Sequence, residues 1–472
     1  MIPRNNLDVD VLVIGAGPAG ATVATLVALA GHRVLLLEQS PPRRGGMLEL
    51  LPPATIHGVF AFTGAQALLQ PHEHAESHGA TLNWGAESYP WPIQFAAPSR
   101  FSRVVPTAYH VERAQVDRAL TDAARRQGAE FRDSCEVVDL FEHDGRVAGA
   151  FWVASDGVRR RTTSRYVVDA TGMDGRLDVV AADGVDGASR HDAFTTLFSY
   201  FTGAQRAGVS MPGDSFVAAF NGGEFWCVPF GPSLTGVGVV LRDHVDVRTD
   251  ADIKQTMQNL LDRCPAAAEY LFGGGPLTAG PQSEAFRRSA RTYARTTFWR
   301  PGLVRIGEAA CAVEPTLGRG IHLATYGALQ AARSINTALL DNADESLLFD
   351  EFEARYRAEH RRICIPLDEL VTLHYDETFN VIAPETGVDA TKLTWAAEAL
   401  GGFSSRDPVL LNATNYRDRR GAPARLDGQD APGAATVDDT GDSSRDRRLL
   451  AVSVDGMRWD TPADVEAVRS LV

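Results

Sequence analysis

Three glycines near the start of the chain have the spacing of a phosphate-binding turn. Gly15, Gly17 and Gly20 follow a valine- and isoleucine-rich run over 8–14, and an alanine-rich run comes after them. In such a turn the first glycine permits the tight bend, the second lets the backbone approach a pyrophosphate, and the third lets a helix pack closely on a strand. The helix then presents its free amides and positive dipole end to the phosphates. The spacing therefore predicts a dinucleotide site.

A carboxylate follows where such a site needs one. Residues 33–37 have the composition of a second strand, and Glu38 ends it. An acidic side chain at this point suits the hydroxyl pair of a ribose. Pro18 and Ala19, within the turn itself, complete the residues that we expect to contact the nucleotide. The whole stretch predicts a βαβ unit.

Two later motifs extend this pattern. A hydrophobic strand ends in Thr171 and Gly172, which we interpret as the return of the chain to the nucleotide domain. Further on, a short strand leads into a glycine-rich loop, and a helix leads out of it. Backbone amides of such a loop can face an anion or the edge of a flavin ring. The residues of this loop expected at the cofactor are Gly307, Glu308, Pro315, Gly318, Gly320 and Ile321.

These motifs, in this order, resemble the FAD-dependent aromatic hydroxylase superfamily, and the resemblance covers roughly residues 8–340. It implies FAD as the cofactor. It also implies that Glu308 holds the ribityl chain, where the superfamily usually has aspartate. Arg113 matches the cofactor-facing arginine of the superfamily, and Arg43 or Arg44 matches its basic residue near the adenosine.

Within this superfamily the chain resembles most closely the flavin-dependent halogenases of the phenol and pyrrole type. The segments that carry this resemblance are residues 49–52, 79–85, 226–229, 320–324 and 373–382. The third of them matches the end of the halogenase motif WxWxIP.

Two departures from the halogenase pattern bear on the reaction. Halogenases use a lysine to hold or relay hypohalous acid made at the flavin, but the matching segment here has Ser77 and His78. The two lysines of the chain, Lys254 and Lys392, lie far beyond it. A serine hydroxyl carries no charge, and a histidine is only partly charged at pH 7. The first tryptophan of WxWxIP is replaced by Glu224.

The departures favour oxygen transfer over halogenation. We therefore expect a monooxygenase that acts on an aromatic or polyketide-like metabolite of secondary metabolism, such as antibiotic biosynthesis, through a flavin C4a-hydroperoxide. The cofactor carries that chemistry, while the protein orients it and excludes water. Trp226 and His322 are the predicted catalytic side chains. Three alternatives stay open: a halogenase with a non-lysine relay, a dehydrogenase or reductase of the geranylgeranyl-reductase type, and a catalytically silent flavin-binding protein.

Composition limits the partners. The formal net charge of −14 argues against nucleic acid, whose phosphates require a basic surface. No secretory leader and no bilayer-length apolar run is visible, which predicts a cytoplasmic protein without an integral membrane segment. The five cysteines lack metal-ligand spacing, so we expect no metal site. With one nucleotide fingerprint, the electrons for oxidation of a small-molecule substrate would come from transiently bound NAD(P)H or from a separate flavin reductase.

The elements that must position these residues predict an α/β fold. Residues 8–190 predict the first part of a Rossmann-like FAD-binding domain, with an insertion at about 54–105, and residues 296–340 predict its last part. Repeated strand-like segments over 191–295 predict an antiparallel-sheet substrate domain.

The rest of the chain divides in three. Residues 341–416 predict a helical C-terminal region. Residues 417–447 are polar and rich in glycine and proline, so they cannot bury enough surface to offset their ordering entropy, which predicts a disordered linker. Residues 448–472 predict a short C-terminal element.

Overall fold

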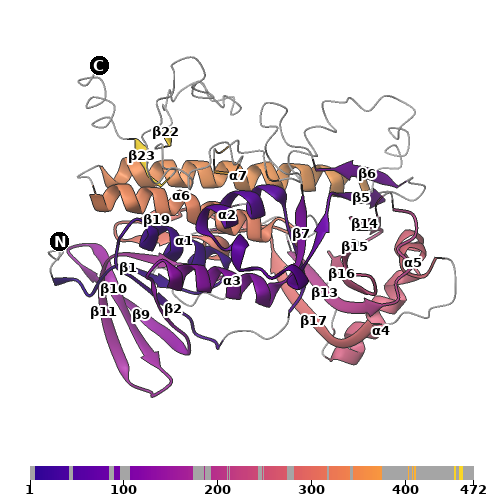
Figure 1. Cartoon of the computed structure of the whole chain (residues 1–472), viewed down its shortest axis with the longest axis horizontal. Helices are drawn as coiled ribbons and strands as arrows, with labels where there is room; N and C mark the ends of the chain where they lie inside the picture. The colour runs from indigo at the N-terminus through magenta and orange to yellow at the C-terminus, as the bar shows by residue number, and fades with distance from the viewer. Residues whose placement is uncertain are drawn as a thin grey trace, which may run out of the picture.

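A largely parallel sheet carries the first glycine turn, with the strand order β19-β20-β11-β1-β2-β8, in which the edge strand β19 pairs antiparallel with β20 (Figure 1). Its central strands consist largely of valine and leucine and are buried, as expected when both faces of a parallel sheet are covered. The strands are β1 (Val9–Ile14), β2 (Val34–Leu37), β8 (Glu130–Arg132), β11 (Arg159–Asp169), β19 (Trp299–Arg300) and β20 (Leu303–Arg305). Helix α1 (Pro18–Leu29) joins β1 to β2, so the predicted βαβ unit is confirmed.

The computed structural model describes part of the 472-residue chain: residues 6–41, 46–83, 90–95, 107–173, 185–186, 193–209, 211, 213–242, 247, 249–273, 281–315, 318–340, 344–374, 402, 407, 409–410, 451–452 and 457–460. The predicted disordered linker at 417–447 and the predicted adenosine-side residues Arg43 and Arg44 lie outside these ranges.

A second, seven-stranded sheet forms the other end of the molecule, with the order β17-β13-β16-β15-β14-β5-β6 (Figure 1). It confirms the predicted substrate sheet, but it is mixed, because β14 and β5 pair in parallel. Strands β5 and β6 come from the expected insertion at 54–105, which thus widens this sheet. The strands are β5 (Gly79–Asn83), β6 (Trp91–Gln94), β13 (Ala193–Thr202), β14 (Ser215–Phe220), β15 (Gly223–Phe230), β16 (Leu234–Leu241) and β17 (Pro281–Arg291).

The two faces of this sheet have different neighbours, because side chains alternate along each strand. One face carries Leu197, Phe225 and Val239 and packs on the helices α4 (Asp250–Leu261) and α5 (Pro265–Phe272). The other face carries Phe198 and Trp226 and packs with Leu48 and Leu50 of β3 (Leu48–Leu51). The second face is therefore turned toward the FAD-binding part.

Smaller elements join the two sheets. Strand β3 forms because it pairs antiparallel with β7, about sixty residues later in the chain, and no local pattern reveals this pairing. These elements are β3, β7 (Ala108–Glu112) and β4 (His74–Ser77) in one sheet; β12 (Val185–Asp186), β18 (Tyr293–Arg295) and β21 (Cys311–Ala312) in another; the π-helix η2 (Ala54–Phe60); the short helices α2 (Ala61–Thr63), η3 (Gln66–Leu68), η4 (Pro71–Glu73) and η7 (Gly307–Ala309); and the hairpin strands β9 (Cys135–His143) and β10 (Arg146–Ala154), which extend β11.

Helices cover the parallel sheet. Helix α3 (Arg113–Arg126) packs on α1, and α6 (Gly320–Leu340) lies between α1 and α7 (Glu345–His374) (Figure 1). The ring of Tyr356 on α7 lies over Gly327 of α6, where a Cβ would be only 2.2 Å from it. The short strands β22 (Ala451–Val452) and β23 (Trp459–Asp460) pair with each other, and β23 lies against α6. Among the described helices, none is long and apolar enough to cross a membrane.

Candidate cofactor and substrate site

The three glycines of the turn differ in their surroundings: Gly15 and Gly20 are closely packed, and Gly17 is open. A Cβ at Gly15, whose φ is +97°, would lie 2.4 Å from the carbonyl oxygen of Ala170, and one at Gly20 would lie 1.8 Å from that of Gly15. These two glycines therefore allow close packing. Around Gly17 the sole atom of the described residues within 4 Å of a built Cβ is Nη2 of Arg113, at 3.7 Å. The backbone of Gly17 is thus open to a pyrophosphate.

Glu38 lies at the carboxyl end of β2, beside this turn. Its Oε2 accepts a 2.7 Å hydrogen bond from the amide of Ala16, and its Oε1 accepts one of 3.0 Å from the amide of Ser40. The carboxylate is therefore held in place and remains partly exposed. Each carboxylate oxygen has a further lone pair for a ribose hydroxyl.

Arg113 approaches the turn from the start of α3. Its Nε donates to Asp117 at 2.9 Å, and its Nη1 lies 3.6 Å from Oε1 of Glu49 on β3. Burial raises the pKa of Glu49, and the charge of Arg113 offsets only part of that shift. Glu49 is a site residue that sequence reasoning did not select, although it opens one of the halogenase-like segments.

The two later motifs meet beside the same turn. Gly172, with a φ of +85°, has Oε2 of Glu308 3.8 Å from the position of a Cβ. The amide of Gly307 donates to the hydroxyl of Tyr356 at 3.1 Å, which ties this loop to α7. Gly318 packs against Leu50 of β3, whereas no atom in the described part of the chain lies within 4 Å of a Cβ built at Gly320. The loop is therefore packed at one glycine and open at the other.

Thr171, Pro18, Ala19, Pro315 and Ile321 complete the predicted cofactor set. Thr171 donates both its amide and its hydroxyl to Oδ1 of Asp169, at 3.1 and 2.7 Å. Pro18 begins α1, and Ala19 lies 3.0 Å from a Cβ built at Gly307. Ile321 is buried and Pro315 is half-buried.

These residues fit FAD. Open backbone at Gly17 suits the pyrophosphate, open backbone at Gly320 suits the ring, and Glu38 and Glu308 offer acceptors for sugar and ribityl hydroxyls. Which residues bind FAD stays a prediction, and the structure adds Glu49 and Arg288 as neighbours of that space. Arg288 of β17 donates to Oε2 of Glu308.

An aromatic wall faces the FAD-binding part from the seven-stranded sheet. The Trp226 ring stacks on Phe198 with centroids 5.4 Å apart, and Phe286 is tilted against the other side of Phe198 at 6.1 Å. The indole lies flat on β16, since a Cβ at Gly238 would be 2.1 Å from its ring carbons. Its N–H is buried without an acceptor among the described residues. An indole has no acid–base role at neutral pH, so Trp226 can shape the site or donate a hydrogen bond.

His322 is fully buried in the first turn of α6. Its Nδ1 is 2.9 Å from the hydroxyl of Thr55, and its Nε2 is 3.2 Å from Oε1 of Glu359. Burial lowers the pKa of His322, so the neutral ring donates to Glu359 and accepts from Thr55. Because both ring nitrogens are engaged inside the helical layer, the predicted catalytic role stays a prediction and a positioning role is better supported.

The segment in which halogenases have their lysine forms a closed polar cluster. The hydroxyl of Ser77 donates to the carbonyl of Gly79 at 3.0 Å and lies 3.5 Å from Oδ1 of Asp214. Asp214 is itself 1% exposed and accepts from the amide of His78 at 2.9 Å. The cluster is satisfied internally, so Ser77 holds strands together.

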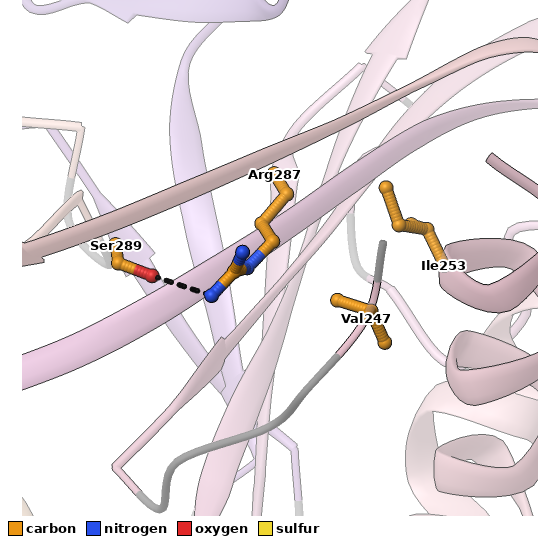
Figure 2. Close-up of a pocket in the computed structure, with 4 residues that line it drawn as sticks. All are labelled: Val247, Ile253, Arg287 and Ser289. Carbon is orange, nitrogen blue, oxygen red and sulfur yellow. Dashed lines mark hydrogen bonds between the residues drawn. The ribbon is translucent and has the colours of Figure 1, made fainter. Parts of the chain in front are cut away.

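A cavity of about 590 Å³ lies on the opposite face of the sheet, beside α4. Figure 2 shows its lining residues Val247, Ile253, Arg287 and Ser289, with Arg287 donating to Ser289 at 3.2 Å. Arg287 pairs with Leu197, whose side chain belongs to the α4 and α5 face. This cavity is therefore separate from the aromatic wall.

Two family models match this chain. The tryptophan halogenase model matches residues 90–381, and an FAD-binding domain model matches residues 10–84. The chain belongs to the tryptophan halogenase family. FAD is the cofactor of this halogenase-family protein, which is an FAD-dependent oxidoreductase, and both predictions are confirmed.

Curated relatives of this halogenase-family chain include halogenases and a reductase. The tryptophan 2-halogenase of Chondromyces crocatus is 24% identical over 357 residues, which cover 75% of this chain and 66% of that protein. The sulochrin halogenase of Aspergillus terreus is 25% identical over 69% of this chain and 62% of its own length. Digeranylgeranylglycerophospholipid reductase 2 of Methanopyrus kandleri is 26% identical over 75% of this chain and 83% of its own length. The matched part of the chain thus spans just under two thirds of the length of each of the two halogenases.

Solved structures share the fold of this halogenase-family protein. A myxobacterial chondrochloren halogenase, described as a variant of FAD-dependent halogenases, has a TM-score of 0.71 and 28% identity, over 96% of this chain and 99% of that one. Anhydrotetracycline hydroxylase from Streptomyces rimosus has a TM-score of 0.66 and 18% identity, over 84% and 76%. The second likeness concerns the fold alone, so the reaction must be argued from the site.

Proposed function

We propose that this protein is an FAD-dependent halogenase of small aromatic molecules that uses a relay other than lysine. The single observation that carries the proposal is the aromatic wall of Phe198, Trp226 and Phe286 across from the FAD site, in a chain of the tryptophan halogenase family. Membership of this family favours halogenation over the oxygen transfer that the missing lysine suggested.

When FAD is bound and reduced, its chemistry would supply two electrons and the halide two more, so that O₂, one halide ion and one proton would yield hypohalous acid and water. Hypohalous acid then replaces an aromatic C–H by a C–halogen bond and releases a second water. The wall suits such a substrate, because aromatic rings stack on one another in offset or edge-on arrangements.

Trp226 supplies the one polar group that the wall offers. A buried N–H without an acceptor costs roughly 1–3 kcal/mol. The buried indole N–H of Trp226 therefore supports an acceptor in the enzyme with its reactants bound, either on the substrate or on the hypohalous acid. Ser77 has no such role in the proposal, because its hydroxyl is already used.

Oxygen transfer to the same substrate is the second candidate. It is favoured by the engaged, uncharged hydroxyl of Ser77 in the segment where halogenases have lysine. In either reaction we expect a separate flavin reductase or transiently bound NAD(P)H as the electron source.

The test needs no native substrate. The FAD-loaded protein is reduced without oxygen, then mixed with oxygenated buffer containing phenol red, with and without bromide, and catalase removes free peroxide. We expect bromide-dependent bromination of phenol red and a flavin reoxidation trace that changes with bromide. Ser77→Ala should brominate like the unchanged protein, and free reduced FAD serves as the blank.

The other outcomes separate the alternatives. If bromide leaves the flavin reoxidation trace unchanged, and phenol red is hydroxylated but not brominated, the monooxygenase would replace the halogenase as the proposed function. Direct reoxidation without either product would favour the dehydrogenase or reductase alternative.

A further inference from the structure

Glu224 is a fully buried carboxylate on the wall side of β15, at the position where halogenases have the first tryptophan of WxWxIP. A buried carboxylate is costly unless an opposite charge and hydrogen bonds compensate it. Arg242, just after β16, provides both, with Nη1 2.5 Å from Oε2 and Nη2 3.2 Å from Oε1 of Glu224. The replacement of tryptophan by glutamate is therefore matched by a bidentate arginine.

Arg242 has a second carboxylate within reach. Its Nη2 also donates to Oε1 of Glu314 at 3.0 Å. Glu314 follows β21 and lies six residues before Gly320, where α6 starts. The side chains of Arg242 and Glu314 are only 9% and 10% exposed, so water screens the interaction little. One guanidinium thus joins the substrate sheet to the cofactor-facing loop.

The register of the sheet explains why Arg242 reaches Glu224. Glu224 pairs with Val240, so Arg242, two residues on, lies on the same face of the sheet. Arg288 lies in the same cross-strand row, through Thr196 and Val240, and it reaches Glu308 in the same loop region. That pair is 44% and 38% exposed, which makes it the weaker tie.

We propose that Arg242 is a positioning residue for FAD, which fixes the loop before α6 by holding Glu314 to Glu224. The inference deepens the proposed function, since it concerns the FAD site of that function. Lysine cannot replace arginine fully in this role, because an ammonium cannot form the bidentate contact and the third hydrogen bond in one plane.

The test measures FAD itself. FAD is titrated into the apoprotein, and the visible flavin spectrum and the midpoint potential of the loaded protein are recorded. For Arg242→Met we expect at least about a tenfold loss of FAD affinity, the scale of a lost buried charge-assisted hydrogen bond, with a shifted flavin spectrum. Arg242→Lys should recover part of both. The control Arg263→Met removes an arginine of the same lobe that donates to the carbonyl of Asn221, and it should leave FAD unaffected.

Glu314→Gln covers the case in which Arg242→Met does not fold. It leaves the Glu224–Arg242 pair of the sheet in place and weakens only the arm to the loop, so we expect a native melting temperature of the apoprotein with weaker FAD binding and a shifted spectrum. Glu314→Gln with native affinity, spectrum and potential would overturn the proposal. A fall in apoprotein stability without any flavin change would show a merely structural role. Neither result depends on bromide or oxygen, so a failure of the halogenase proposal is recognised separately.

Discussion

His110 is a buried residue whose ionisation links pH to stability. Its Nδ1 donates to the carbonyl of Pro229 at 2.8 Å, and its Nε2 accepts from the hydroxyl of Ser215 at 2.9 Å. Desolvation lowers the pKa of His110 from 6.5 to about 4. The folded state therefore keeps the ring neutral at a pH where the unfolded chain already binds a proton.

We predict that stability is lost as pH falls from about 6.5 toward 4. A shift of this size corresponds to roughly 3 kcal/mol for a fully buried group. In thermal melts from pH 7 to pH 5, His110→Gln should flatten the decline in melting temperature, although His57, His322 and His360, whose pKa values burial also lowers, keep some slope. The exposed His72→Gln is the control, and an unchanged slope in His110→Gln would contradict the assignment.

At the scale of elements, the β1–turn–α1 unit separates cofactor binding from packing. Gly17 has a φ of −66° and open space at its Cβ position, whereas a Cβ at Gly20 would strike the carbonyl of Gly15. Gly17→Ala should therefore fold normally and bind FAD at least about tenfold more weakly, because the methyl group occupies the approach of the pyrophosphate.

Gly20→Ala is the matched variant for the same unit. It should destabilise the apoprotein by about 1–3 kcal/mol, the usual cost of overpacking. Chemical denaturation of the apoproteins and FAD titration measure the two effects. A loss of apoprotein stability in Gly17→Ala equal to that in Gly20→Ala would show that the turn has no open face.

At the scale of the whole molecule, a segment near the C-terminus is fastened to the helical layer. The indole N–H of Trp459 donates to Ser334 at 2.9 Å, and its amide donates to Thr337 at 3.0 Å. The guanidinium groups of Arg333 and Arg355 lie 5.3 and 4.7 Å from the ring centroid. Burial, hydrogen bonds and cation–π contacts thus act on one side chain.

Trp459→Ala should release this segment. The lost burial is worth about 3–5 kcal/mol when a tryptophan is truncated in a core. We expect trypsin to cleave after Arg458, the half-buried neighbour of Trp459, much faster in this variant than in the unchanged protein, and the melting temperature to fall by several degrees. Trp299→Ala, which changes a half-buried tryptophan of β19 that stacks on Phe349 of α7, should leave the cleavage rate unchanged. Equal cleavage in both variants would mean that Trp459 does not hold the tail.

The sequence alone determined the FAD-binding frame. A strand, a glycine turn and a helix are local patterns. Gly15, Gly17 and Glu38 lie close enough in the sequence that their spacing predicts their positions in one βαβ unit. The alternating strands of the second sheet followed from the same local periodicity. The reaction was harder to predict, because it depends on one missing lysine and on groups that local patterns do not connect.

Tertiary structure decided which distant residues meet. The strand β3 depends on its pairing with β7, and β5 joins the substrate sheet beside β14, more than a hundred residues away in sequence. In the sequence Glu224 is only a departure from the WxWxIP motif, whereas in the fold Arg242 pairs it and also binds Glu314. The sequence predicted His322 as a catalytic residue, but in the fold both of its ring nitrogens have hydrogen-bond partners, Thr55 and Glu359. Long-range pairing places these groups, and a charge or hydrogen bond acquires its partner only when the chain is folded.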